Sequence, residues 1–370
     1  MDMLLCMRLL LDASFLAEAK VGISRYIIQL AIHLKQLCEV TILTSRPDAF
    51  AEIGCRLITI PRWTSTHRGR ILWELTSLAN RCTSDFDVLL CTTPMAPPLV
   101  RLAKVATVHD ITPLVMSDRH SSRNKALFWL SLQTLRFADA VVVDSRHTKN
   151  DLMGLGLVPS KRINVVPAGP GIRPTEADNQ FARQFHPYLL YVGGYIPTKN
   201  VPRLLAAFAR ARIGDPTRLV MVGYGSPRDL ATTRAVVSRL GLAQRTLTLS
   251  DLDDADLSSL YRGCRAFVFP SLYEGFGLPV LEAIAHGAPV VCSKSSSLPE
   301  VGGQAVLYFD PMSIDDIAKK LEAILGDEPL RSDLRQRGLA RAGCFSWENT
   351  ARGVLDAVQS ALGRARTGAH

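Results

Sequence analysis

The chain has 370 residues, of which 47% are hydrophobic and 21% are charged, and its formal net charge is +9. These values predict a globular protein of two domains with ample core. Residues 1–180 contain 21 basic and 16 acidic side chains, a balance of +5, and residues 181–370 contain 22 and 18, a balance of +4. Because the excess is spread evenly, it favours an anionic ligand or a membrane surface and disfavours a nucleic-acid-binding arm.

The eight cysteines are scattered and form no C-x-x-C pair, which predicts reduced thiols in a cytoplasmic protein. The opening MDMLLCMRLLLDA has the apolar character of a secretion signal. Arg8 interrupts its apolar run and Asp12 ends it, so we interpret Arg8 to Leu11 as a first strand. No apolar run reaches the ~18 residues that a membrane-spanning helix needs.

Short apolar runs alternate with amphipathic stretches along both halves of the chain. In the first half they predict strands at residues 8–11, 40–43, 56–60, 88–91, 105–108, 140–143 and 165–167. In the second half they predict strands at residues 188–192, 218–222, 246–249, 266–269 and 290–291. Helices are expected at residues 25–37, 128–137, 201–211, 227–240, 280–285, 314–325, 329–342 and 347–362, and from residue 148. The basic and aromatic stretch 61–78 is also expected to continue into a helix, and a further helix is expected before Tyr261.

Strands that alternate with helices of this length form parallel sheets covered on both faces. A stretch rich in glycine, proline and polar residues, Ala168 to Pro187, separates the two halves as a linker. We therefore predict domains at residues 1–175 and 176–345, and a C-terminal helix at 346–370 that can cross back to the first domain. The predicted fold class is α/β, with two Rossmann-like, doubly wound parallel-sheet domains that face a cleft.

The stretch from Phe267 to Val291 combines a strand, a loop with two glycines, a helix and another strand. Pro279 lies just inside the expected helix start, where its missing N–H would have no partner anyway. The amide N–H groups of Gly275, Phe276, Gly277 and Leu278 can point at a ligand, and the helix dipole favours negative charge there. This arrangement predicts a phosphate-binding site.

Two acids bracket this loop, Glu274 before it and Glu282 inside the helix. Carboxylates accept hydrogen bonds from sugar hydroxyls, so amides and acids together predict a pocket for a nucleotide sugar. Taken singly, Glu274 fits a solvated loop residue equally well, and Glu282 fits an acid in the first turn of a helix.

Two further glycine turns follow predicted strands. In GGYIPTKN, Gly194 leaves the backbone bare and Lys199 stands near a helix start, which indicates a nearby anion or a solvent-exposed lysine. Gly223 follows the next strand and is expected close to the nucleotide. In the first half, His109 stands at the carboxyl end of a strand, which fits a catalytic or a structural histidine.

The run EGFGLPVLEAIAHGAPVV, followed by SSLPEVGGQAVLYFDP, resembles the E-x7-E signature of retaining, GT-B-fold glycosyltransferases of family 4 (glycosyl transferases group 1). The segments VHDITP, ADAVVVDSRHTKNDL, FSWENTA and VGISRYIIQLA resemble mannosyl- and rhamnosyltransferase relatives in that family. GGYIPTKN is similar to the family's G-x(4–5)-[RK]-K-N segment. Many relatives have an arginine where this chain has Thr198 or Gly194.

The resemblance implies retaining transfer of a hexose, with mannose the first choice, in polysaccharide or lipopolysaccharide assembly. The donor is a GDP-, UDP- or dTDP-linked sugar, and the acceptor is a hydroxyl of a glycan or a lipid-linked glycan. Lys199 is implied to hold the diphosphate, Glu282 the ribose, and Glu274 and His109 the transferred sugar as catalytic residues. Gly22 is implied to let its loop approach the donor phosphate or the acceptor.

Other functions fit less well. A nucleotide-sugar 2-epimerase of the same fold and a non-catalytic sugar-nucleotide-binding protein stay open as alternatives. A Rossmann-type dehydrogenase is disfavoured, because the segment from Ala19 to Arg25 has one glycine where G-x-G-x-x-G is needed. Acidic clusters at 85–87 and 251–254 are interpreted as turn and helix-start residues, and no zinc spacing is present. We predict no cofactor and no metal requirement.

Bases and indoles occur together at residues 62–73 and 119–129. They fit either ordinary surface elements with buried aromatic side chains or contact with anionic lipid headgroups. The resemblance favours the second interpretation and predicts a cytoplasmic protein with a peripheral contact at the inner face of the plasma membrane.

Overall fold

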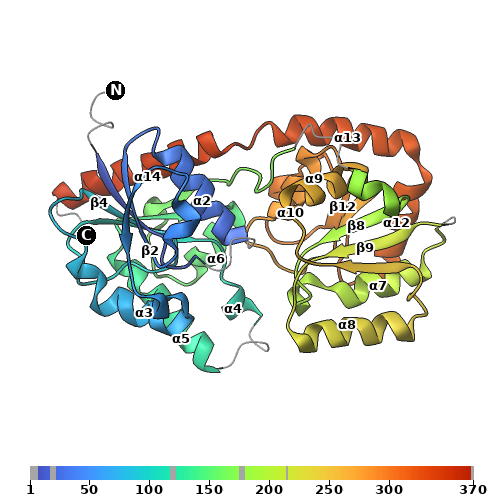
Figure 1. Ribbon diagram of the computed structural model, residues 1–370, viewed down its shortest axis with the longest axis horizontal. Coiled ribbons are helices and arrows are strands. Elements are labelled where there is room, and N and C mark those ends of the chain that lie inside the picture. Colours follow the sequence, from blue (N-terminus) through green and yellow to red (C-terminus); the bar gives the residue numbers. More distant parts are fainter. Residues whose placement is uncertain (1–6, 17–21, 117–121, 175–179, 214–215, 368–370) are drawn as a thin grey trace. The chain divides into compact units, whose positions relative to one another are not determined.

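The computed structural model describes residues 7–16, 22–116, 122–174, 180–213 and 216–367. The chain forms two compact units, one from Met1–Gly171 with Ser346–His370 and the other from Ile172–Phe345. Each unit has its own sheet and helices (Figure 1). Cys6, the middle of the predicted linker and the start of the 119–129 stretch lie outside the described residues.

The first unit holds a seven-stranded sheet in the order β3-β2-β1-β4-β5-β6-β7, and all neighbouring strands pair in parallel. The strands are β1 (Arg8–Asp12), β2 (Glu39–Thr44), β3 (Arg56–Thr59), β4 (Val88–Cys91), β5 (Ala103–Val108), β6 (Ala140–Val143) and β7 (Ile163–Val165). The helices described in this unit are α2 (Gly22–Leu34), α3 (His67–Thr76), α4 (Thr112–Val115), α5 (Ser122–Gln133), α6 (Arg146–Gly154) and α14 (Trp347–Thr367).

The second unit holds a six-stranded parallel sheet in the order β10-β9-β8-β11-β12-β13. The strands are β8 (Tyr188–Val192), β9 (Arg218–Val222), β10 (Thr246–Leu249), β11 (Ala266–Phe269), β12 (Val290–Ser293) and β13 (Leu307–Phe309). Its helices are α7 (Val201–Arg210), α8 (Pro227–Arg239), α9 (Asp254–Gly263), α10 (Leu278–Ala285), α11 (Leu298–Gly302), α12 (Ile314–Gly326) and α13 (Glu328–Ala342).

The core of each unit lies against its sheet. Every residue of β6 (AVVV) and β11 (AFVF) is buried, as expected for strands with helices on both faces. In the second unit α7 packs against α12, and α10 packs against α13 (Figure 1). Helix α7 buries Leu204, Leu205 and Phe208, and each such side chain stabilises the fold by ~1.5–3 kcal/mol.

The strand order reverses at β1/β4 in the first unit and at β8/β11 in the second. Doubly wound sheets bind ligands beyond the carboxyl ends of strands near such a reversal. The predicted fold class, two doubly wound parallel sheets, is confirmed, and that the domains face a cleft stays a prediction. Three of these elements were not predicted, the short edge strand β13 and the short helices α4 and α11, because none of them shows a clear hydrophobic period.

Within the described ranges, no helix is both long enough and apolar enough to cross a bilayer. In the same ranges, no cluster of three or more His, Cys, Asp or Glu side chains is arranged to hold a metal ion. The cysteines that the structure describes are all free, and Cys38, Cys91, Cys264 and Cys292 are buried.

Candidate functional site

The loop after β11, residues 270–277 (the Glu274 loop), ends in a glycine with a left-handed backbone. Gly277 caps the N-terminus of α10 with a φ of 109°, a left-handed backbone that glycine adopts at little cost. A Cβ at Gly277 would lie 2.6 Å from Cδ2 of Leu298. Pro279 occupies the first turn of α10, so the predicted order of strand, loop, helix and strand is confirmed.

Serines that follow β12 hold the Glu274 loop in place. The Ser296 hydroxyl accepts a hydrogen bond from the Glu274 N–H at 2.8 Å. The buried Ser297 hydroxyl lies 2.9 Å from the Glu274 carbonyl and 2.8 Å from the Phe276 carbonyl. Sequence analysis missed this role of the SKSSS run. The sequence pattern that could have indicated this role is the run of serines directly after β12, the strand that pairs with β11.

Three amides at the start of α10 point to an anion site. The N–H groups of Phe276, Gly277 and Leu278 donate to no group in the part of the chain that the structure describes. The Phe276 ring is itself buried and meets Phe345 edge-on, with ring centroids 5.9 Å apart. A rigid loop with open amides at a helix N-terminus can bind phosphate.

Lys199 and Glu274 form an ion pair at this loop. Lys199 ends a 3-10 turn directly before Asn200, the N-cap of α7. Its Nζ lies 2.5 Å from Oε1 of Glu274, and the two side chains are 19% and 12% exposed. The same ammonium lies 5.4 Å from the centre of the Phe269 ring. The residue predicted to bind phosphate, Lys199, and the residue predicted to bind the sugar, Glu274, are thus neighbours.

Backbone contacts join the Lys199 loop, residues 193–200, to the Glu274 loop. The Thr198 carbonyl accepts from the Leu272 N–H at 2.7 Å and from the Ser271 hydroxyl at 3.1 Å. These bonds fix the position of Lys199 relative to Glu274, because all three bonded groups lie within a few residues of the pair. The two loops therefore form one structural site.

The other two glycine positions lie at the adjacent strand ends. Val192 pairs with Val222 in the β8–β9 register, which brings Gly193 beside Gly223. A Cβ at Gly223 would lie 1.9 Å from the Gly193 carbonyl oxygen, so only glycine fits there. The Gly194 carbonyl accepts from the Tyr191 hydroxyl at 2.6 Å. Both glycines predicted for the donor site therefore line the same sheet edge.

Glu282 is buried in α10 and is 6% exposed. Its Oε2 accepts a hydrogen bond from the Tyr261 hydroxyl at 2.9 Å. Tyr261 also stacks on His286, with ring centroids 5.2 Å apart. Burial lowers the pKa of His286. The role of Glu282 in ribose binding stays a prediction.

His109 lies in the first unit, directly after β5. Its Nδ1 lies 2.6 Å from Oδ2 of Asp144, which directly follows β6. Burial acts to lower the pKa of His109, but the charge and hydrogen bond of Asp144 act against it and the pKa is raised. The sequence did not identify Asp144 as a site residue. Its position directly after the predicted strand 140–143, as His109 follows the strand 105–108, places both residues at the carboxyl edge of the sheet.

Gly22 is the first residue of α2. The sequence predicted a loop at Gly22 and a helix from Arg25, and this prediction of the helix start was wrong. The apolar spacing of IIQLA identified the helix, but that spacing does not mark its first turn. The structure gives no test of the donor contact expected for Gly22.

A second buried polar cluster lies after β1. Asp12 and Glu74 are each 1% exposed. The Ser14 N–H donates to Asp12 at 2.9 Å, and the Ser14 hydroxyl donates to Glu74 at 3.1 Å. Arg70 lies 3.8 Å from Glu74. Burial raises the pKa of Asp12 and raises that of Glu74 to about 8.

The acidic pairs that could suggest a metal site have other partners. Asp87 pairs with Arg8 at 3.0 Å, and Asp85 lies in a turn with Thr83. Asp253 caps α9 by accepting from the Asp256 N–H at 2.7 Å. Their interpretation as turn and helix-start residues is confirmed.

Family comparisons cover most of the chain. The profile described as "Glycosyl transferases group 1" matches residues 173–341, and "Glycosyltransferase Family 4" matches residues 21–170. O-antigen chain mannosyltransferase B of Escherichia coli is 34% identical over 270 residues, which are 69% of this chain and 70% of that protein. The chain belongs to glycosyltransferase family 4.

Other similar proteins agree with this assignment. The serotype-specific mannosyltransferase WbdA of Escherichia coli is 30% identical over 266 residues, 68% of this chain but only 33% of that protein. The crystal structure of HepE from Anabaena with UDP and glucose has a TM-score of 0.77 at 16% identity and covers 96% of this chain and 100% of that one. At this identity the likeness concerns the fold, and this family 4 glycosyltransferase has the GT-B fold that was predicted.

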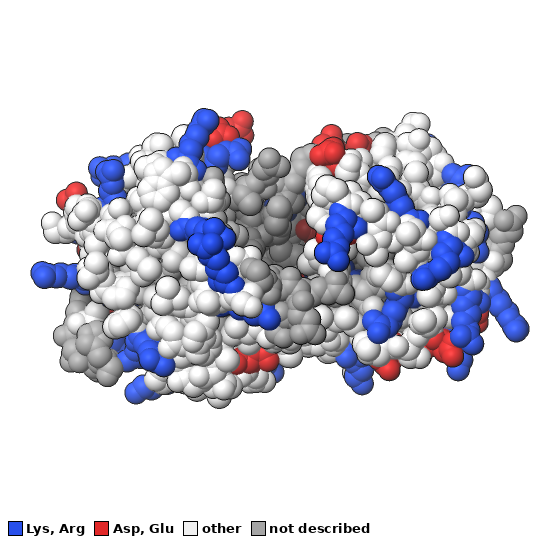
Figure 2. All heavy atoms as spheres, turned by 90° about the horizontal axis from the view of Figure 1, so that it is seen from below, with Lys and Arg blue, Asp and Glu red and all other residues white. Residues whose placement is uncertain are grey.

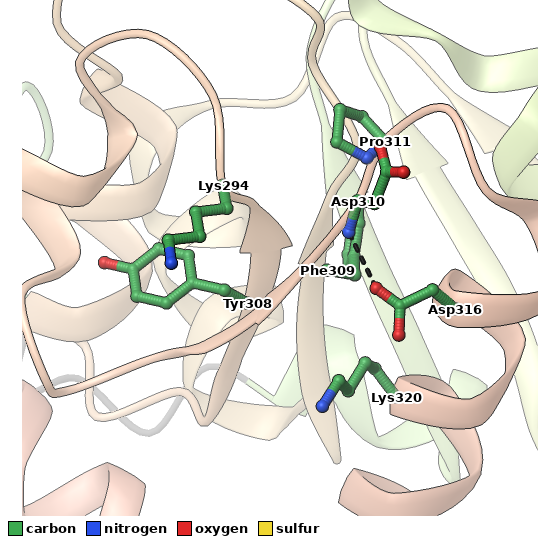
Figure 3. A pocket seen from close by; sticks show the side chains of 7 residues that line it. All are labelled: Lys294, Tyr308, Phe309, Asp310, Pro311, Asp316 and Lys320. Atoms are coloured by element: carbon green, nitrogen blue, oxygen red, sulfur yellow. Dashed lines mark hydrogen bonds between the residues drawn. The ribbon is translucent and has the colours of Figure 1, made fainter.

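An open hollow of about 350 Å³ lies beyond the carboxyl ends of β12 and β13 in this glycosyltransferase (Figure 3). It is lined by Lys294, Tyr308, Phe309, Asp310, Pro311, Asp316 and Lys320. Its acids serve the turn before α12, because Asp316 accepts from the Asp310 N–H at 2.7 Å and Asp310 accepts from the Met312 N–H at 2.9 Å. None of the residues predicted to bind the donor lines this hollow.

The basic and aromatic stretches of the glycosyltransferase differ in exposure. In the 62–73 stretch Trp73 is 4% exposed and belongs to a core cluster, whereas Trp63 is 48% exposed. In α5, Trp129 and Leu130 are 40% and 47% exposed. Lys and Arg side chains are scattered over the face drawn in Figure 2.

Proposed function

We propose that this family 4 glycosyltransferase transfers mannose from a nucleoside diphosphate sugar to a hydroxyl of a glycan or lipid-linked acceptor. The transfer retains the anomeric configuration and needs no metal ion. The observation that carries the proposal is the Lys199–Glu274 ion pair beside three open amides in a chain 34% identical to an O-antigen mannosyltransferase.

The donor site has a part for each chemical group of the donor. Lys199 and the amides of residues 276–278 bind the diphosphate, where negative charge develops as the sugar leaves. Glu274 then binds hydroxyls of the transferred sugar. Glu282 accepts hydrogen bonds from the ribose hydroxyls, and the glycines at 194 and 223 let the nucleotide approach the backbone.

The reaction breaks the bond between the sugar C1 and the diphosphate oxygen, and the electron pair leaves with the diphosphate. The acceptor oxygen forms the new bond to C1 on the same face. Its proton passes to the departing phosphate oxygen. His109 holds the sugar during this step, and Lys199 with the amides neutralises the leaving group in place of a metal ion.

Purified protein tests the proposal directly. A thermal-shift panel of GDP-mannose and UDP- and dTDP-linked sugars identifies the donor, because a bound ligand raises the melting temperature. Transfer to a synthetic mannoside acceptor is then followed with and without EDTA, and the anomeric configuration of the product is read by NMR. An inverted product would refute retention, loss of activity in EDTA would refute metal independence, and turnover of donor without acceptor would indicate an epimerase.

The acceptor side includes a peripheral membrane contact through α5. Only Ser131 and Leu132 are buried in this helix. Trp129 and Leu130 are exposed, and so is the basic Arg123 of the same helix. Indole and aliphatic side chains next to bases bind at the surface of anionic bilayers. This surface brings the protein to a lipid-linked acceptor.

Vesicle flotation separates this contact from simple charge attraction. The protein is expected to float with phosphatidylglycerol vesicles and not with phosphatidylcholine vesicles. Trp129→Ser should reduce flotation several-fold, because the indole enters the interface. Met312→Ser, at a residue 60% exposed in the second unit, is the control. Equal flotation of both variants would exclude α5 as the contact.

A further inference from the structure

His109 and Asp144 meet because of the sheet register. Strands β5 and β6 pair with Val108 opposite Val143, so the next residue of each strand emerges at the same level of the sheet. These residues are His109 and Asp144. They are 35 residues apart along the chain. The parallel pairing of β5 with β6 brings them next to each other in space.

The backbone around both residues is fixed. Ser145, which follows Asp144, caps α6 by accepting from the Thr148 N–H at 3.0 Å. The Thr148 hydroxyl in turn donates to the His109 carbonyl at 3.3 Å. One cap therefore anchors the acid and the histidine together, and neither can move without disturbing the start of α6.

The side-chain contact uses one ring nitrogen and leaves the other open. Nδ1 of His109 meets Asp144, while Nε2 has no hydrogen-bond partner among the described residues. A carboxylate at Nδ1 requires a proton there, so Nε2 accepts a hydrogen bond when the ring is neutral and donates one when it is charged. The charged or polar groups that face the ring are Asp144, Asp110 and the backbone of Thr92.

Aromatic side chains from α2 and α14 hold the ring from the side. Tyr26 meets His109 edge-on, with ring centroids 4.6 Å apart and a 78° angle between the planes. Trp347 meets Tyr26 at 5.5 Å and 70°, and its indole N–H donates to the Pro170 carbonyl at 2.8 Å. The Tyr26 hydroxyl has no partner among the described residues. Tyr26 thus acts through the shape of its ring.

We propose that Asp144 is a positioning residue that fixes the tautomer and the plane of the His109 ring, with Tyr26 and Trp347 as its lateral support. Nε2 is thereby kept available for the contact with the transferred sugar that the proposed function assigns to His109. The inference rests on the proposed role of His109 in sugar transfer. It also explains why the VGISRYIIQLA and FSWENTA segments accompany the histidine segment in one chain, since they supply Tyr26 and Trp347.

The wild-type protein provides the first test. In protein labelled with ¹⁵N-histidine, with His109 assigned through His109→Gln, the neutral ring is expected to carry its proton on Nδ1. A ring protonated on Nε2 would overturn the proposal. This measurement needs no substrate, so it stands even if the proposed transferase activity fails.

Asp144→Asn in the full chain is the second test. The amide keeps the volume of the carboxylate but not its charge, so the pKa of His109 measured by NMR should fall by about one unit. With the mannosyl donor, kcat should fall ~10- to 100-fold while KM for the donor stays within about twofold. An unchanged pKa and an unchanged kcat would overturn the proposal.

Matched variants separate positioning from general stability. Asp151→Asn removes the carboxylate that lies 3.3 Å from His147 in α6 and should change neither kcat nor the pKa of His109. Tyr26→Phe should keep kcat, whereas Tyr26→Leu should lower it several-fold at unchanged KM, because only the leucine loses the ring edge. If His109→Ala is fully active while the NMR results are as expected, His109 has no role in sugar transfer. Asp144 would still position the His109 ring in that case.

Discussion

The donor loops of the second unit and the His109 environment of the first are built by different means. The Glu274 loop is held by hydroxyls bonded to backbone carbonyls, and its two charged side chains satisfy one another at 2.5 Å. His109 is held by the Asp144 carboxylate and by the ring of Tyr26, and its Nε2 has no hydrogen-bond partner in the described part of the chain. If Lys199 binds the diphosphate as proposed, it must divide its contacts between Glu274 and phosphate, whereas the proposed positioning of His109 needs no ligand.

Loss of the lysine should give the largest effect. Lys199→Ala removes the only side-chain cation proposed for the diphosphate and leaves Glu274 without its partner. We expect kcat/KM to fall by ~10²–10³-fold and donor affinity to be greatly weakened. Calorimetric titration with GDP-mannose and steady-state kinetics measure both. Lys294→Ala, in the separate hollow, is the control, and wild-type donor affinity in Lys199→Ala would remove the lysine from the site.

The glycine cap tests how far the donor loop depends on its backbone. Gly277→Ala must place a side chain at a φ of 109° and within 2.6 Å of Leu298. The free energy of unfolding should fall by ~1–3 kcal/mol, with weaker donor binding because the amides shift. Urea titration measures the first effect. Gly326→Ala, where no atom lies within 4 Å of the new Cβ, should stay within ~0.5 kcal/mol, and equal losses in both would refute the strain.

Buried acids of the first unit predict a pH dependence. The folded protein keeps the Glu74 proton up to about pH 8, whereas an unfolded carboxyl releases it near 4.5. Between these values the unfolded state binds fewer protons, so the free energy of unfolding falls as pH rises. Glu74→Gln removes this slope and should be more stable than the wild type at pH 9, by on the order of 2 kcal/mol, and similar at pH 5.

Thermal unfolding at pH 5 and pH 9 measures this difference. Glu52→Gln, at an exposed position, is the control and should behave as the wild type at both values. A Glu74→Gln protein that is less stable than the wild type at pH 9 would contradict a raised pKa and would indicate that the ionised acid stabilises Arg70.

The serine support should give the smallest effect. Ser297→Ala removes a buried hydroxyl that bonds the carbonyls of Glu274 and Phe276, at a cost of about 1 kcal/mol in the free energy of unfolding. Donor affinity should weaken a few-fold, because the loop that carries the amides loosens. Ser238→Ala, on the exposed side of α8, is the control. An effect on stability with no effect on affinity would separate the serine from the donor loop.

Much of the proposed donor site lies in two sequence segments, because its residues are close in the sequence. Glu274, the amides of residues 276–278 and Glu282 belong to one strand–loop–helix segment, and Lys199 follows a glycine pair at another strand end. Asp144 and Ser297 could not be assigned in this way. Asp144 reaches His109 through the pairing of β5 with β6, and Ser297 reaches the Glu274 loop through the pairing of β11 with β12. The hydrophobic pattern of a strand does not show which strand it pairs with.

The basic and aromatic stretches illustrate the same limit. Trp63 and Trp73 belong to the same basic and aromatic stretch of the sequence, but Trp73 is buried in the core of the first unit and Trp63 is exposed. Composition identified both as candidates for a lipid contact. Only the packing of α3 against the sheet separates a core side chain from a surface one, because burial depends on residues far away in the chain.

By itself the sequence determined the alternation of strands and helices, the glycines and proline that shape the donor loops, and the family. These features are local, since apolar spacing, left-handed turns and helix starts depend on a few adjacent residues. The tertiary structure alone decided that Lys199 pairs with Glu274, that Ser297 holds the loop, and that Asp144 and Tyr26 set the ring of His109. Those contacts join residues that only the sheet order and register bring within hydrogen-bonding distance.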